Sequence, residues 1–218
     1  MNTLKRNLMS IIALVAMAGF SLFIYDSLPA EIPTDYNLQG EVTDTEPRLV
    51  AALLMPLVFA VTIVIVNVLI WISPQKFSMP SSKRAMDIII FGVGVLLFFI
   101  SISMLVGNWD YRLFIRLFSY GMAAFLIITG NVFGKTERNF FIGIRIPWTL
   151  ASANNWKATH RMAGRLMVLF GFVLLASNTL VPSLELMLVF ALAPVILPVF
   201  YSLYFYLRFE RPTEVNSK

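Results

Sequence analysis

Residues 49–72 read LVAALLMPLVFAVTIVIVNVLIWI, an apolar run without a charged side chain. An α-helix rises about 1.5 Å per residue, so roughly 20 residues cross the hydrocarbon core of a bilayer, which is about 30 Å thick. Similar runs lie at approximately 8–25, 87–106, 112–132, 163–181 and 184–207. They lack the alternation of lipid-facing and lumen-facing residues that is typical of barrel strands. The sequence therefore predicts an all-α, polytopic membrane protein, a six-helix transmembrane bundle.

The composition agrees with this fold class. Of 218 residues, 58% are hydrophobic and 13% charged, whereas soluble domains average roughly 45–50% apolar and about 25% charged. The absence of cysteine excludes disulfides, thiolate catalysis, Cys-ligated zinc and iron–sulfur clusters. The net charge of +5 resides in loops between spans, so we expect no direct nucleic acid binding. We also expect no cofactor.

The distribution of cations predicts the orientation. If the N-terminus is inside, the cytoplasmic segments hold Lys5, Arg6, Lys76, Lys83, Arg84, Lys135, Arg138, Arg145, Lys157, Arg161, Arg165, Arg208, Arg211 and Lys218. Only Arg48, Arg112 and Arg116 fall elsewhere. This excess predicts that both termini are cytoplasmic. The first run is longer than a signal-peptide core of about 7–15 residues. The candidate cleavage position, Ala30, follows Leu28 and Pro29 rather than the small residues that a signal peptidase requires, so we expect an uncleaved span.

The spans divide the chain into four parts. We expect an N-terminal two-helix unit (1–72) with an acidic extracytoplasmic loop (26–48), a connecting loop with the third helix (73–111), a C-terminal unit (112–208) with a cytoplasmic loop (131–165), and a tail (209–218). The sequence does not indicate an oligomeric state.

The outer loop is strongly acidic. It holds Asp26, Glu31, Asp35, Glu41, Asp44 and Glu46 against the single cation Arg48. Such a surface attracts cationic ligands, including basic peptides; alternatively, acids collect outside because basic residues are retained inside. The loop lacks the ligand spacing of an EF-hand, so we expect no metal. Pro29 and Pro33 stiffen the loop and Gly40 permits a turn, which predicts an ordered cap.

The spans carry few ionisable groups. Asp87 and Glu185 lie near predicted helix ends, and carboxylates at the midplane are missing, which argues against ion-coupled transport. A transporter of neutral solutes stays open. Asn67, Asn131 and Asn178 are candidates for interhelical hydrogen bonds.

The inner loop, NVFGKTERNFFIGIRIPWTLASANNWKATHRMAGR (131–165), is the main candidate for specific function. Gly143 and Pro147 disfavour a continuous helix. The apolar residues that would return it to the headgroup region are Phe140, Phe141, Ile142, Ile144 and Trp148. Arg145 would contact lipid phosphate or cap a helix; alternatively, it recognises an anion or latches two helices.

A helix capped by Thr149 or Ser152 is expected to run through 155–165 into the fifth span. Helical spacing aligns Trp156, His160 and Gly164 on one face. The other face holds Lys157, Arg161 and Arg165, which suits anionic headgroups and makes membrane lipids expected partners. A lone histidine does not form a metal site, so we expect a structural, hydrogen-bonding role; acid–base work stays open.

The loop resembles the signature of the SdpI family, membrane immunity proteins against the sporulation-delaying peptide toxin. The resemblance covers roughly 110–208. The positions on the motif are Asn131, Gly134, Asn139, Gly143, Arg145, Pro147, Trp148, Thr149, Trp156, Thr159, His160, Arg161 and Gly164. The outer segment LPAEIPTDYNLQGEV is similar to the LPxxIPTHFNxxG segment of an uncharacterised domain often fused before this one, with Asp35 in place of the usual histidine.

The resemblance implies a six-helix protein that protects its producer from a membrane-active peptide, with a peptide toxin outside and a cytoplasmic regulator inside as partners. The implied ligand or relay residues are Asn131, Asn139, Arg145, Pro147, Trp148, Thr149, Trp156, Thr159, His160 and Arg161. We expect the extracytoplasmic cap to involve Pro29, Pro33, Asp35, Asn37 and Gly40. We expect Arg145, Trp148, Trp156 and His160 to form one cluster. Two rivals remain: a membrane enzyme acting on a phospholipid or isoprenoid headgroup, and a small-molecule transporter.

Overall fold

The computed structural model describes residues 3–37, 39–72, 80–139 and 142–211. Within them, six helices are long and apolar enough to cross a membrane. They are α1 (Thr3–Ile24), α2 (Arg48–Ile72), α3 (Pro80–Val106), α4 (Tyr111–Phe133), α6 (Ala153–Leu180) and α7 (Leu184–Phe205), and the short helix α5 (Pro147–Ala151) precedes α6. The predicted six-helix transmembrane bundle is confirmed.

The start of α6 illustrates where sequence runs and helices differ. The apolar run begins near residue 163, but the helix begins at Ala153 because the Ser152 hydroxyl accepts a hydrogen bond from the Asn155 N–H (3.2 Å). Such a cap satisfies a backbone donor that has no partner inside the helix. Ser152 is therefore the cap of the predicted helix, and Thr149 lies within α5.

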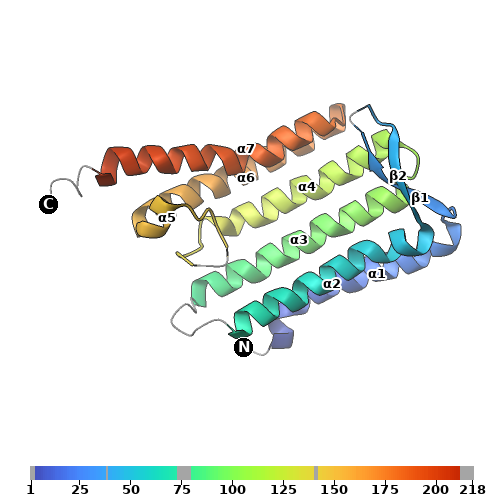
Figure 1. Cartoon of the computed structure of the whole chain (residues 1–218), viewed down its shortest axis with the longest axis horizontal. Coiled ribbons are helices and arrows are strands. Elements are labelled where there is room, and N and C mark those ends of the chain that lie inside the picture. Colours follow the sequence, from blue (N-terminus) through green and yellow to red (C-terminus); the bar gives the residue numbers. More distant parts are fainter. Residues whose placement is uncertain (1–2, 38, 73–79, 140–141, 212–218) are drawn as a thin grey trace.

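The helices form a row that begins with α1 and α2, continues through α3 and α4, and ends with α6 and α7 (Figure 1). α4 packs extensively against α3 and α6. The start of α1 and the end of α7 lie at the end of the bundle that carries α5, and two strands cover the opposite end (Figure 1). That the shared end is cytoplasmic stays a prediction from the distribution of cations.

The strands form an antiparallel hairpin between α1 and α2, made of β1 (Glu31–Tyr36) and β2 (Val42–Pro47). At its turn, the Asn37 side-chain oxygen accepts hydrogen bonds from the N–H groups of Gln39 and Glu41, at 3.0 and 2.9 Å. Gly40 has φ +84°, a backbone conformation that favours glycine. The ordered cap is thus a hairpin, which the sequence analysis did not anticipate because its prolines disfavour paired strands.

The hairpin is fastened to the bundle by apolar contacts. Ile32 is fully buried and belongs to a cluster with Leu28, Ala51, Ala52, Met104 and Leu105. The Tyr36 ring lies 4.8 Å from the Phe114 ring and 5.5 Å from the Tyr111 ring, centroid to centroid. Burial raises the pKa of Tyr36 above its usual value. The cap therefore rests directly on the start of α4.

Two of the three predicted interhelical asparagines are confirmed. Asn67 in α2 accepts a hydrogen bond from the Asn7 side-chain amide in α1 (3.0 Å). The Asn178 amide in α6 donates to the Arg116 carbonyl in α4 (3.0 Å). Asn131 is exposed and donates to the Ile127 carbonyl in its own helix (2.7 Å), so that prediction is wrong, since its side chain faces outward.

Candidate functional site

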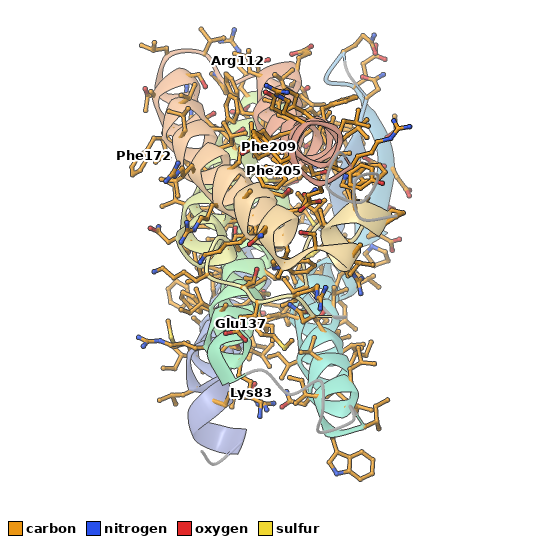
Figure 2. The ribbon with its side chains drawn as sticks, turned by 90° about the vertical axis from the view of Figure 1, so that its left-hand side faces the viewer. Lys83, Arg112, Glu137, Phe172, Phe205 and Phe209 are labelled. Carbon is orange, nitrogen blue, oxygen red and sulfur yellow. The ribbon has the colours of Figure 1, made fainter. Side chains whose placement is uncertain are left out.

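The segment between α4 and α6 turns back over one end of the bundle. Figure 2 looks onto this end, where Glu137 appears between Lys83, near the start of α3, and Phe209, after α7. At its start, the Thr136 hydroxyl donates to the Phe133 carbonyl (2.8 Å). Phe140 and Phe141, expected to help this segment return to the headgroup region, lie outside the described residues.

A close approach of α4 and α6 supports this turn. A Cβ on Gly164 would lie 2.7 Å from the Gly130 carbonyl oxygen, and a Cβ on Gly130 would lie 2.8 Å from the Gly164 carbonyl oxygen. The two backbones are thus in direct contact, a geometry that small residues permit. As a result, His160, which lies one turn before Gly164 in α6, is held against Phe133 at the end of α4.

Three aromatic rings fill the space above this contact. The His160 imidazole is fully buried and stacks on Trp156, with centroids 4.0 Å apart and planes at 15°. Phe133 covers another side of the imidazole, with centroids 5.1 Å apart. The Trp156 indole N–H donates to the Thr136 carbonyl (2.9 Å). Helical spacing predicted the shared face of Trp156, His160 and Gly164, and all three are buried.

Hydrogen bonds fix the state of His160. Its Nε2 lies 2.9 Å from the Ile144 backbone nitrogen and its Nδ1 lies 2.8 Å from the Trp156 carbonyl oxygen. A backbone N–H only donates, so Nε2 accepts and Nδ1 carries the proton that is donated to Trp156. Gly143 has φ +130°, and a Cβ there would overlap Nε2 and lie 2.8 Å from the Trp156 ring. Histidine and glycine together hold the loop backbone against α6.

Polar side chains fix the rest of the loop. Thr149 is fully buried; its hydroxyl accepts from the Ile146 N–H (3.1 Å) and lies 2.7 Å from the Ile144 carbonyl. The Asn139 side-chain oxygen accepts from the Ile142 N–H (2.8 Å). The Arg138 guanidinium donates to the carbonyls of Leu150 and Ala151, the last residues of α5. The described residues of this segment are thus held in place by hydrogen bonds.

A second set of contacts ties α5 and α6 to the last helix. The Trp148 indole N–H donates to the Ser202 hydroxyl in α7 (2.7 Å). The Asn155 amide donates to the Ser202 carbonyl (3.0 Å) and to a Glu210 carboxylate oxygen (3.3 Å). The Ser152 hydroxyl donates to the other Glu210 oxygen. Sequence reasoning missed Ser202 and assigned Glu210 to the tail, although a carboxylate directly after an apolar span was a signal for a partner.

Of the residues that were grouped by sequence, the structure brings Trp156 and His160 together and places Trp148 elsewhere. Trp156 and His160 stack, whereas Trp148 lies against α7, with its ring 6.4 Å from that of Tyr206. Arg145 is exposed beside Ile144. Of the remaining candidates, Asn139 and Thr159 are buried, Asn131 and Arg161 are exposed, and Pro147 begins α5.

The candidate cap residues lie together at the other end. Pro29 and Asp35 are exposed, Pro33 is buried beside Ile32, and Asn37 and Gly40 form the turn. In the register of the hairpin, Asp35 lies opposite Asp44. The part of the chain that the structure describes contains no group of three or more His, Asp or Glu residues arranged to hold a metal ion.

A groove of about 1360 Å³ lies beside the aromatic stack. It is lined by Gly130, Asn131, Gly134, Lys135, Thr136, Glu137, Arg138, Ala153, Trp156, Lys157, Arg161, Gly164, Arg165, Val168, Leu169 and Phe172. Five of these residues are cationic and one is acidic. His160 and Arg145 do not line the groove, so the single imidazole is not placed for acid–base work there.

Comparisons with known protein families find one match in the C-terminal part of the chain and one in the N-terminal part. Residues 135–202 match the SdpI/YfhL protein family, and residues 12–60 match a domain of unknown function (DUF1648). The chain is 29% identical over 172 residues to the Immunity protein SdpI of Bacillus subtilis (strain 168), covering 78% of this chain and 80% of that protein. No solved structure shows a significant match. The resemblance to the SdpI family is confirmed.

Proposed function

We propose that this chain is a multi-pass bacterial cell-membrane protein that protects its producer from a membrane-active peptide toxin. One observation carries the proposal: the similarity to a protein named as an immunity protein extends over most of both chains. The cytoplasmic orientation of both termini, predicted from the cations, would direct the hairpin to the side from which such a peptide arrives.

The charge of the hairpin supports a cationic ligand. Glu31, Asp35, Glu41 and Asp44 are exposed on it. Asp35 and Asp44 are opposite each other across the strands, and like charges in such pairs destabilise a sheet by about 0.2–1 kcal/mol. A bound cationic peptide would relieve this repulsion, whereas the free protein retains it.

We further propose that α4 relays the state of the cap to the inner loop, where a cytoplasmic regulator would bind. α4 contacts the hairpin through Tyr111 and Phe114, near its start, and contacts His160 through Phe133, its last residue. A displacement of this rigid helix at the cap would therefore change the packing of the imidazole that holds Ile144.

Protection is proposed to need no catalysis. Both nitrogens of His160 are hydrogen-bonded inside the protein, and its side chain is fully buried away from the cationic groove. The groove does not extend through the bundle: its lining ends at Gly130 in α4 and at Phe172 in α6, in the half that carries the loop. This geometry favours a binding protein over the lipid-enzyme and transporter alternatives.

Survival of a toxin-sensitive bacterium challenged with sporulation-delaying peptide tests the cap. We expect protection by the wild-type chain and weaker protection by the Asp35→Asn, Asp44→Asn double variant at equal membrane levels. The matched control is Asp26→Asn with Glu185→Gln, which removes two exposed acids outside the strands. Equal protection by both double variants would exclude a specific role for the hairpin pair, and no protection by wild type would exclude this peptide as the ligand.

The same assay tests the inner loop. Because Arg145 is exposed, Arg145→Ala changes the surface of the loop. Lys83→Ala removes another exposed cation, near the start of α3, and serves as the control. We expect reduced protection with Arg145→Ala alone; full protection by this variant would remove Arg145 from the relay.

A further inference from the structure

The groove between α4 and α6 has an excess of unpaired positive charge. Arg138 is engaged by two backbone carbonyls. The other four cations of the lining are Lys135, Lys157, Arg161 and Arg165; all are exposed, and within the described residues none makes a hydrogen bond or ion pair with the protein. Four cations facing one groove repel each other, so an anionic occupant would stabilise the arrangement.

The groove changes from cationic to apolar along α6. Arg161 and Arg165 are four residues apart and therefore share a face, which continues with Val168, Leu169 and Phe172. Leu169 and Phe172 are more than half exposed, and Phe172 projects outward from the bundle (Figure 2). One wall of the groove is therefore cationic at the loop end and consists of exposed apolar side chains toward the middle of α6.

The length of this wall matches one leaflet of a membrane. At about 1.5 Å per residue, Arg161 and Phe172 are separated by roughly 16 Å along the helix axis. Half of a hydrocarbon core of about 30 Å is about 15 Å. A molecule with its charge at Arg161 would therefore extend an acyl chain past Phe172 to near the bilayer midplane.

We propose that this groove is a binding site for an anionic phospholipid. The phosphate lies among Lys135, Arg161 and Arg165, and an acyl chain packs along Leu169 and Phe172. An inorganic anion would use the cations and leave the apolar wall uncovered. A zwitterionic phospholipid would bring its ammonium group toward four cations, so the site selects a headgroup with net negative charge. The site does not depend on the proposed immunity function.

Native mass spectrometry of the purified full-length chain, titrated with phosphatidylglycerol or phosphatidylcholine, tests the proposal. We expect phosphatidylglycerol to bind at least about tenfold more tightly. The Arg161→Ala, Arg165→Ala double variant should weaken its binding by about tenfold. The control is Arg112→Ala with Arg116→Ala, which removes two exposed cations at the same four-residue spacing from the start of α4. Arg112 is labelled in Figure 2.

Each other outcome overturns the proposal. Equal weakening by both double variants would indicate a nonspecific response to net charge, and unchanged binding by Arg161→Ala, Arg165→Ala would exclude the groove. Inorganic phosphate at millimolar concentration is a third arm: full displacement of phosphatidylglycerol by phosphate would identify a simple anion site. Retention of the lipid in its presence is the result that we expect, because the apolar wall contributes to binding.

Discussion

Replacing Gly143 with alanine should destabilise the protein by about 2–4 kcal/mol. Gly143 has φ +130°, and a side chain in such a conformation costs about 1–3 kcal/mol. The added methyl would also overlap Nε2 of His160, which accepts the hydrogen bond of Ile144. Displacing the imidazole loses that bond, which is worth about 1 kcal/mol. The strain and the lost bond therefore act on the same contact between the loop and α6.

Thermal unfolding of the purified chain in detergent measures this effect. For a protein of this size, each kcal/mol lost from the free energy of unfolding lowers Tm by about 2–4 °C, so Tm should fall by about 4–16 °C. Gly19→Ala is the control, because nothing lies within 4 Å of a Cβ at Gly19 in α1. Its higher helix propensity should leave Tm unchanged or raise it slightly. An unchanged Tm for Gly143→Ala would refute the reasoning, as would an equal fall in both variants.

Further substitutions test other contacts. Trp148→Phe and Ser202→Ala should each lower stability by about 1 kcal/mol, and the double variant should lose little more, because both remove one hydrogen bond; additive losses in thermal unfolding would contradict this coupling. In the absence of peptide, Asp35→Asn with Asp44→Asn should raise stability by about 0.2–1 kcal/mol by removing cross-strand repulsion, which denaturation of the purified variant measures. Gly164→Ala should reduce the yield of folded protein in size-exclusion chromatography, since its methyl meets the α4 backbone; wild-type yield would show that the helices separate easily.

Sequence periodicity identified parts of the site but not its partners. Helical spacing placed Trp156 and His160 on one face, and the structure stacks their rings. The acceptor role of His160 depends on the Ile144 N–H, a group that every residue other than proline carries and that no pattern marks. Glu210 lies 58 positions from Ser152, to which it is hydrogen-bonded, so only folding reveals the pair.

The sequence by itself determined the six spans, because a hydrocarbon core of about 30 Å requires about 20 apolar residues whatever their neighbours are. It also determined the acidic character of the outer loop and the cationic face of α6, since charge and helical spacing are local properties. Only the tertiary structure decided that the outer loop pairs as a hairpin over α4, that Trp148 lies against α7 rather than beside His160, and that the cations of α6 line a groove. These features depend on contacts between residues far apart in the chain, where the packing of one helix sets the surroundings of another.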